Sequence, residues 1–433
     1  MPTAGESVIE RYGEIDYARP PSFIPYGRQS IEEDDIDAVV EVLRSDWLTQ
    51  GPTIERFEAA LCAATGAKYA IAVSNGSAAL HLAVMAIGMQ AGDHGVTSAI
   101  TFAASANCIA YAGGRVHFSD VDQNTALLDL PLLQNQLKTL VSAGMSPKVI
   151  IPVDMGGQCA DLPSIRRLAD SCGAKVIEDA AHSLGAAYEE KGKRFMAGSC
   201  VHTDMAILSF HPVKHITTGE GGAVLTNEKA LADHVRDLRN HGVHKDPLRF
   251  ERLNEGPWYY EQDQLGFNYR LTDIQCALGI SQLAKLQRFL ARRREIAGAY
   301  DRAFKAVSLG EFLKPLGQLP GRLHAYHLYI VRLVEQSGED PQQLARRRKD
   351  LYLFLHNRRI FTQVHYIPVN WHPYYRRFHG ASFKDCPAAN AYYAGCLSLP
   401  VYAEMGDSEV DRVVGALHAW SRSKTNRAFK GKC

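Results

Sequence analysis

The stretch that decides the fold is "SFHPVKHITTGEGGAV", residues 209–224, which sets one lysine between two apolar segments. Residues 206–210 and 223–225 are apolar and predict buried strands. Lys214 lies in the polar, glycine-containing loop that joins them. Most loop lysines are simply solvated, but a lysine held between two buried strands can also form a Schiff base with a carbonyl compound. Other features of the sequence distinguish between these two interpretations.

Strands and helices alternate on both sides of this loop. Residues 68–88 read as strand, tight turn and helix, and "KVIIPVDMGG" (148–157) and "KVIEDAAHSLG" (175–185) are apolar runs that each end in an acid. Apolar runs separated by helices are typical of strands that are buried on both faces of a sheet. We therefore expect an α/β fold with a large doubly wound domain over residues 46–275.

Weaker patterns flank this domain. Residues 1–45 predict an N-terminal arm, loose to about residue 28, followed by a helix with Ser30 as candidate cap. A single long helix is expected to start near Thr272. Residues 276–433 predict a smaller α/β domain, because they contain a strand-like run at 325–333 and a basic amphipathic helix at 341–360.

Several polar or aromatic residues follow predicted strands, where open α/β sheets bind ligands. The segment Ser74–Ser77 joins a strand to a helix, whose free N–H groups suit a phosphate, although an ordinary turn would have the same sequence. Phe102 could stack on a planar ring or pack in the core. Ser209 ends the strand before the lysine loop and offers another hydroxyl group for a phosphate.

Asp179 ends a predicted buried strand, where a carboxylate needs a cationic partner. A protonated pyridine nitrogen would serve, because the carboxylate keeps the proton on the ring. His182 could orient the ring, or it could bond to the backbone at the start of a helix. Together with Lys214, these features give the parts of a pyridoxal 5′-phosphate site in chain order: phosphate turn, ring stack, acid for the ring nitrogen and lysine for the aldehyde.

The composition argues against several other classes of protein. The 433-residue chain has a formal net charge of +1 and no run of about 18 apolar residues, so we expect neither nucleic acid nor a membrane as a partner. It contains no GxGxxG, GxxxxGK[ST] or HExxH motif, so dinucleotide, P-loop and metal sites lack support. Nine cysteines without a CxxC pair, and a start without a secretory signal, predict a cytoplasmic protein.

Four segments resemble the DegT/DnrJ/EryC1/StrS nucleotide-sugar aminotransferases: "SFHPVKHITTGEGGAV", "EDAAHSLGA", "SNGSAALHLA" and "GFNYRLTDIQCALGISQL". The resemblance runs from about Pro25 to Tyr402, and "VHYIPV" and residues 24–52 are most similar to the pseudaminic-acid branch. It implies a fold-type I, pyridoxal-phosphate-dependent aminotransferase that forms a homodimer with shared active sites. It also implies L-glutamate as amino donor and a 4-keto-6-deoxy nucleotide sugar as acceptor, in surface-glycan biosynthesis.

The resemblance also implies a role for individual residues. Lys214 and Asp179 match the catalytic positions, which hold the aldehyde and the pyridine nitrogen. Asn268 matches a position that reaches the phosphate in the neighbouring subunit. The family's other cofactor-binding positions are matched by Gly76, Ser77, Phe102, His182 and Ser209. Its substrate-binding positions are matched by Gln50, His327 and Tyr366.

Two further points bear on the reaction. Relatives that dehydrate sugars carry histidine at the position of Lys214, so the lysine favours transamination. The chain departs from the family pattern at Asn370, Trp371 and Asn390, which leaves the exact sugar open. The alternatives are another keto nucleotide sugar (of perosamine, bacillosamine or 3-keto type), a non-catalytic sugar-nucleotide-binding protein, or a structural lysine without cofactor.

Overall fold

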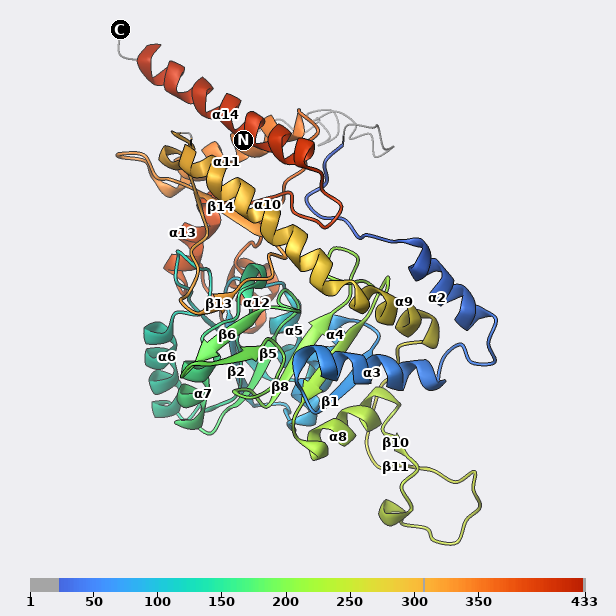
Figure 1. Cartoon of the computed structure of the whole chain (residues 1–433). Helices are drawn as coiled ribbons and strands as arrows, with labels where there is room; N and C mark the ends of the chain where they lie inside the picture. The colour runs from blue at the N-terminus through green and yellow to red at the C-terminus, as the bar shows by residue number, and fades with distance from the viewer. Residues whose placement is uncertain (1–22, 307, 431–433) are drawn as a thin grey trace, which may run out of the picture.

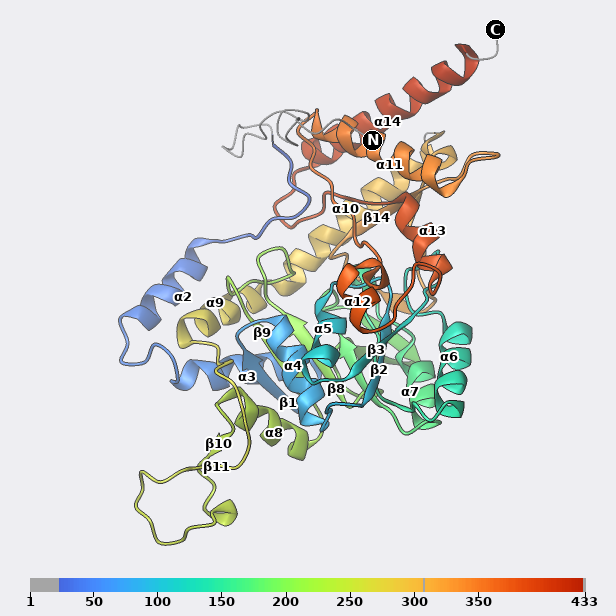
Figure 2. The same cartoon turned by 180° about the vertical axis from the view of Figure 1, so that it is seen from behind.

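The centre of the molecule is a seven-stranded sheet with helices on both sides (Figures 1 and 2). The computed structural model describes residues 23–306 and 308–430. The strand order is β1-β9-β8-β5-β4-β2-β3, and β9 alone runs against the others, which confirms the predicted α/β class with a mixed sheet. The strands are β1 Tyr69–Val73, β2 His94–Ser98, β3 Arg115–Ser119, β4 Pro147–Ile151, β5 Lys175–Asp179, β8 Met205–Ser209 and β9 Gly222–Thr226.

Strands β1, β4, β8 and β9 are predominantly apolar because helices cover both faces of this sheet. Residues such as Ile71, Val149 and Val224 are fully buried. The helix α3 shows how the sequence sets element ends: Pro52 stands in its first turn, and Gly66 ends it at a φ of 80°. The covering helices are α3 Pro52–Thr65, α4 Gly76–Ala86, α5 Ala104–Tyr111, α6 Leu130–Ser142, α7 Leu162–Asp170 and α8 Lys229–Arg239.

Two predictions about the N-terminal region are wrong. Glu32, not Ser30, caps helix α2 (Glu33–Leu43), in a reciprocal capping box with Asp35. The arm is not loose up to residue 28, since Ile24 is buried and exchanges backbone hydrogen bonds with Arg359 and Phe361. The predicted loose residues 1–22 lie outside the described residues.

The long helix predicted from Thr272 is two helices, α9 Asp273–Ala284 and α10 Leu286–Ala306. The first helix starts where it was expected, and Thr272 caps it through a capping box with Gln275. The break falls at Lys285, whose amino group lies 2.5 Å from Asp34 and 2.8 Å from Asp35 of α2. The ion pairs hold α2 against α9.

A second hydrophobic core lies around a three-stranded sheet and the helices α10, α11 and α14, above the large sheet in Figure 1. The chain also returns to the first core, because Val369, Tyr375 and Tyr392 pack there. The boundaries predicted at residues 45/46 and 275/276 stay predictions. The elements concerned are β12 Leu313–Pro315, β14 Tyr329–Leu333, β15 Cys396–Leu399, α11 Pro341–His356, α12 Pro373–Phe378, α13 Pro387–Gly395 and α14 Asp407–Lys430.

Short elements complete the described chain. No helix in residues 23–306 or 308–430 combines the length and apolar character that crossing a membrane requires. The small strands and 3-10 turns are β6 Ala187–Glu190, β7 Lys193–Met196, β10 Val243–His244, β11 Glu261–Gln262, β13 Arg322–Leu323, η1 Met155–Gly157, η2 Pro247–Arg249, η3 Ser308–Glu311 and η4 Val369–Trp371.

Candidate active site

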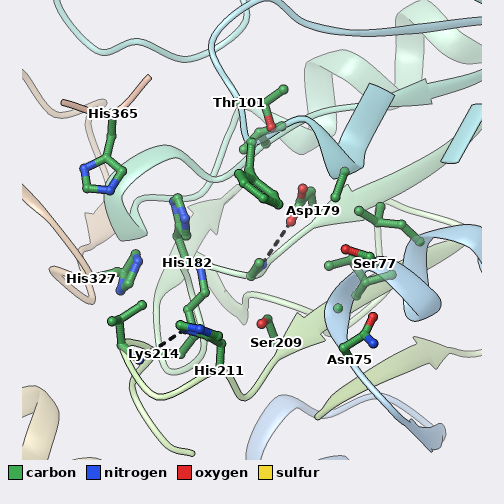
Figure 3. A pocket seen from close by; sticks show the side chains of 18 of the residues that line it. Asn75, Ser77, Thr101, Asp179, His182, Ser209, His211, Lys214, His327 and His365 are labelled. Atoms are coloured by element: carbon green, nitrogen blue, oxygen red, sulfur yellow. Dashed lines mark hydrogen bonds between the residues drawn. The ribbon is translucent and has the colours of Figure 1, made fainter. Parts of the chain in front are cut away.

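The parallel strands end at one edge of the sheet, beside a cavity of about 580 Å³ (Figure 3). This volume is in the range of a small-molecule site. Nine of the eleven residues predicted for the site line the cavity, and they come from segments far apart in the chain. They are Gly76, Ser77, Phe102, Asp179, His182, Ser209, Lys214, His327 and Tyr366.

One end of the cavity is the start of helix α4. The Asn75 side chain caps this helix by accepting from the N–H of Ala78 at 2.8 Å, so the first N–H groups, those of Gly76 and Ser77, stay available. Ser209 closes the other side of this turn: a Cβ on Gly76 would lie 3.0 Å from the Cβ of Ser209. Hydroxyl groups beside a helix N-terminus form a good site for a phosphate.

Gly222 on β9 lets this turn pack closely against the sheet. A Cβ at Gly222 would lie 2.6 Å from the carbonyl carbon of Asn75 and 2.8 Å from the N of Gly76. These are backbone atoms, which cannot move aside as a flexible side chain can. A side chain here would therefore displace the turn that forms the candidate phosphate site.

Asp179 lies between the two ends of the cavity in Figure 3. Its carboxylate accepts from Ser105 Oγ at 2.6 Å and from the N–H of Ala181 at 3.2 Å. Burial nevertheless raises the pKa of Asp179, although these two bonds and the charge of Lys214 oppose the rise. A buried carboxylate in this state is stabilised by a close cation, so it fits the protonated nitrogen of a pyridine ring.

Lys214 is not a solvated loop lysine. The residue is half-buried and lines the cavity, and burial lowers its pKa to about 8 against the opposing effect of Asp179. A lysine with this pKa carries a useful fraction of neutral, nucleophilic amine near neutral pH. The alternative of an ordinary surface lysine is therefore wrong.

A cluster of histidines occupies the end of the cavity away from Asn75, Ser77 and Ser209 (Figure 3). The rings of His182 and His327 lie 4.4 Å apart, and His182 Nε2 is 3.1 Å from the hydroxyl of Tyr366. The Nδ1 atoms of His182 and His327 are buried, and neither has a partner among the described residues. Free polar atoms of this kind are aimed at a ligand or at water.

The histidine cluster is held neutral. Burial lowers the pKa of His182 and His327 well below the usual range, and that of His365 to about 3. Gly157 brings the two segments together: its φ is 108°, and a Cβ there would lie 2.9 Å from both the carbonyl oxygen of His182 and the N of His327. With the histidines neutral, Lys214 is the one lysine or arginine among the described residues that lines the cavity and can contribute a positive charge.

Phe102 does not pack in the core. It is 61% exposed, and its ring lies 6.3 Å from that of Tyr366 across the cavity. A large exposed aromatic ring at the end of a strand is available for stacking on a planar ligand. The prediction that Phe102 packs in the core is therefore wrong. The prediction that the His182 ring bonds to the backbone is also wrong, because its Nε2 contacts Tyr366 and its Nδ1 has no partner among the described residues.

Two predicted residues do not reach the cavity of their own chain. Gln50 and Asn268 are both exposed. Asn268 forms a β-bridge with Asn240, and Gln50 lines a separate surface cleft. That cleft contains five cationic side chains, which are Lys229, Arg236, Arg239, Lys245 and Arg249, and three acidic ones, which are Asp233, Asp237 and Asp246.

The three departures from the family pattern also lie outside the cavity. Asn370 is fully buried and donates from Nδ2 to the carbonyl oxygen of Ser382 at 2.8 Å. Trp371 donates from Nε1 to Oδ1 of Asn390 at 2.7 Å. These residues stabilise the segment around α12 and α13 and do not line the cavity.

The sequence interpretation missed several residues of the site. The hydroxyl of Thr101 lies 2.7 Å from that of Ser105, which in turn donates to Asp179. Thr101 could have been found, because it precedes Phe102 at a strand end. Ser105 gave no signal, since only the tertiary structure brings the start of α5 beside Asp179. The other lining residues that were missed include Tyr26, Val153, His211, Glu220 and His365.

Known proteins share both this sequence pattern and this fold. The sequence model of the DegT/DnrJ/EryC1/StrS aminotransferase family matches residues 29–418. The spore coat polysaccharide biosynthesis protein SpsC of Bacillus subtilis is 38% identical over 398 residues, which cover 91% of this chain and 96% of SpsC.

Solved structures give the same picture. PseC of Helicobacter pylori, an aminotransferase involved in the biosynthesis of pseudaminic acid, is 29% identical and superposes with a TM-score of 0.80 over 93% of this chain and 100% of PseC. The PLP form of Spr1654 from Streptococcus pneumoniae, provisionally described as a sugar aminotransferase, is 26% identical, with a TM-score of 0.80 over 93% of this chain and 99% of that one. These structures confirm the predicted fold.

Proposed function

The chain belongs to the DegT/DnrJ/EryC1/StrS aminotransferase family, and from this premise we propose that it moves the amino group of L-glutamate to a 4-keto-6-deoxy nucleotide sugar with pyridoxal 5′-phosphate as cofactor. The observation that carries the proposal is the cavity itself, in which a buried lysine and a buried carboxylate face a helix N-terminus. The lysine, the acid and the anion site match the aldehyde, ring nitrogen and phosphate of this cofactor.

The residues of the cavity fit the cofactor along its whole length. Gly76 and Ser77 would bind the phosphate with their N–H groups, and Ser209 with its hydroxyl. Phe102 would stack on the ring, and Asp179 would accept a hydrogen bond from the protonated ring nitrogen and so keep that proton on the ring. When bound, pyridoxal phosphate supplies an aldehyde that joins to amines and a ring that delocalises the electron pair left by proton removal.

Lys214 has two tasks in this proposal. Its neutral amine holds the aldehyde in the resting enzyme, which the pKa of about 8 makes possible near neutral pH. The same amine would also act as general base and then as general acid, holding the proton that is taken from the α-carbon of L-glutamate. L-Glutamate leaves as 2-oxoglutarate before the keto sugar binds, so the kinetics should be ping-pong.

The substrates would be held by residues of two subunits. We propose that His327 and Tyr366 contact the substrate beside the cofactor, with His182 near the ring. Gln50 and Asn268 are exposed outside their own cavity, which supports a homodimer in which each chain completes the site of the other. The enzyme would act in the cytoplasm, as expected from its cysteine pattern.

The acceptor we propose is UDP-2-acetamido-2,6-dideoxy-beta-L-arabino-hexos-4-ulose, on the way to pseudaminic acid or a related surface glycan. The likeness to Helicobacter pylori PseC supports this sugar. The higher identity to SpsC, whose name refers to spore coat polysaccharide, favours a different keto nucleotide sugar as the second candidate. Either sugar would undergo the same transamination.

Two experiments test the proposal. Borohydride reduction of the holoenzyme, followed by peptide mapping, should place a pyridoxyl group on Lys214; a label elsewhere, or none, contradicts the assignment. Incubation with L-glutamate and a panel of keto nucleotide sugars, followed by mass spectrometry, should show 2-oxoglutarate and one aminated sugar. A colourless protein that binds sugar nucleotides without forming 2-oxoglutarate would instead be a binding protein.

A further inference from the structure

A second pair of carboxyl groups lies directly behind Asp179. Glu178 precedes it on β5, so its side chain points to the opposite face of the sheet. There Glu178 is 1% exposed and hydrogen-bonded to the side chain of Asp154, which is fully buried. The N–H of Asp154 donates to the carbonyl oxygen of Asp179 at 3.1 Å. The pair is thus part of the strand ends that carry the acid of the active site.

The surrounding donors determine which of the two groups keeps a proton. Asp154 accepts from the N–H of Ala160 at 2.8 Å and from Ser183 Oγ at 2.6 Å, one on each oxygen. Within the described part of the chain, Glu178 accepts one donor, the N–H of Gly198, at 3.2 and 3.1 Å from its two oxygens. Two buried carboxylates in contact cannot both be ionised. The group with fewer donors is the one that retains its proton.

Among residues 23–306 and 308–430, no lysine or arginine forms an ion pair with either acid. The sulfur of Cys159 lies within 4.8 Å of both acids. The nearby Arg322 guanidinium donates to the backbone carbonyl oxygen of Cys159 at 3.0 Å. Burial raises the pKa of Glu178 well above its usual range, and the charge of Asp154 raises it further. Burial also raises the pKa of Asp154, to about 6, but the donors Ser183 and Ala160 oppose this rise.

We propose that Glu178 is a neutral carboxylic acid that donates a hydrogen bond to an ionised Asp154, and that Asp154 is a positioning residue of the active site. Asp154 holds Ser183, which follows His182, and its backbone binds Asp179, so it fixes both residues at once. Its charge behind Asp179 also favours the proton on a bound ring nitrogen. The positioning role rests on the proposed function.

Two nearly isosteric substitutions distinguish the members of the pair. Glu178→Gln sets an N–H where the acid has its O–H, so Asp154 keeps both its donor and its charge. Asp154→Asn removes the charge and sets an NH₂ group against the N–H of Ala160 or the hydroxyl of Ser183. In the holoenzyme we expect Asp154→Asn to lower kcat about 10- to 100-fold with little change in the KM for L-glutamate. Glu178→Gln should leave kcat near the wild-type value.

Infrared difference spectra test the proton directly, because a carboxylic acid absorbs at a higher frequency than a carboxylate. We expect the wild-type holoenzyme to show a buried carboxylic-acid band that Glu178→Gln lacks. The matched control is Glu189→Gln on β6, an acid with a 47% exposed side chain paired with Arg194, which should keep the band.

Three results would overturn the proposal. They are a wild-type spectrum without the band, an equal loss of kcat in Glu178→Gln and Asp154→Asn, and an unchanged kcat in Asp154→Asn. The band does not depend on the cofactor, so it decides the state of Glu178 even if Asp154→Asn does not fold. The infrared band also separates this inference from the proposed function. If the proposed function is wrong, Asp179→Asn should turn over normally while the band is still present.

Discussion

The capture of cofactor by the apo enzyme should titrate with Lys214. Burial lowers the pKa of this lysine from 10.5 to about 8, and the charge of Asp179 limits the decrease. Only the neutral amine attacks an aldehyde. We therefore expect the rate of covalent capture to rise with pH, with a midpoint near 8, and to be level above it.

The difference from an exposed lysine is large. At pH 7 a pKa of 8 in place of 10.5 gives about 300-fold more neutral amine. Asp179→Asn should then shift the midpoint to a lower pH, because it removes the carboxylate that stabilises the Lys214 ammonium group. A shift in this direction is hard to obtain from a general loss of structure, which would expose the lysine and move the midpoint upward.

The assay is stopped-flow absorbance after mixing apo enzyme with excess pyridoxal phosphate, with borohydride trapping to count the bound cofactor. Lys214→Ala should show no trapped adduct at that position. Asp170→Asn is a matched control, since this acid lies on α7 with its side chain 64% exposed and paired with Arg166. It should keep the wild-type midpoint.

A midpoint near 10.5 in the wild-type protein would show that the amine is solvated, and the argument from burial would be wrong. An upward shift in Asp179→Asn would show that the carboxylate does not interact with Lys214 as described. Equal midpoints in Asp179→Asn and Asp170→Asn would lead to the same conclusion.

Three further predictions follow from the same geometry. The pKa of Lys214 is about 8 in the folded protein and 10.5 in the unfolded chain, so the unfolded chain binds more protons between these pH values. Lys214→Met should therefore raise the free energy of unfolding of the apo protein by up to about 3 kcal/mol below pH 8. This gain should disappear above pH 10.5, as urea unfolding at several pH values would measure. Gly222→Ala should weaken cofactor binding in an absorbance titration, because its Cβ would lie 2.6 Å from the carbonyl carbon of Asn75. Gly415→Ala is the control and should bind cofactor normally, because a Cβ there has no neighbouring atom within 4 Å. Lys214→Ala and Asn268→Ala proteins, each poorly active, should regain about a quarter of wild-type activity when refolded together; no recovery would mean that Asn268 acts within its own chain.

Most of the large sheet could be predicted from the sequence because several of its strands, such as β1, β4, β8 and β9, are predominantly apolar and are followed by polar residues. Lys214, Asp179 and the turn at Gly76 were found in this way, since residues at the carboxyl ends of parallel strands meet at one edge. Ser105 could not be found, because its contact with Asp179 depends on how α5 packs. The pairing of Asp154 with Glu178 is also a product of tertiary structure.

The errors at the N-terminus have the same physical origin. Ser30 has the right residue type for a helix cap, yet its carbonyl oxygen accepts from Gln282 Nε2 at 2.8 Å, and the helix begins later. Ile24 follows a segment rich in proline, which suggested a loose arm, but it pairs with a strand-like segment more than 300 residues away. Local propensity contains no information on such long-range contacts.

The charges of the cavity explain why a single chain is not expected to suffice. Both proposed substrates are anions, yet Lys214 is the one lysine or arginine that lines the cavity in residues 23–306 and 308–430, and the cofactor would occupy it. The surrounding histidines are neutral, because burial lowers their pKa values. A diphosphate or a carboxylate in this cavity would therefore lack a cationic partner. The cleft around Gln50 has five cationic side chains on the surface of the same chain, against three aspartates that line it as well. If the homodimer brings this cleft to the cavity of its partner, the second subunit supplies the positive charges that the cavity lacks. Dilution to monomer should then abolish substrate binding at a protein concentration at which Lys214 still reacts with an aldehyde.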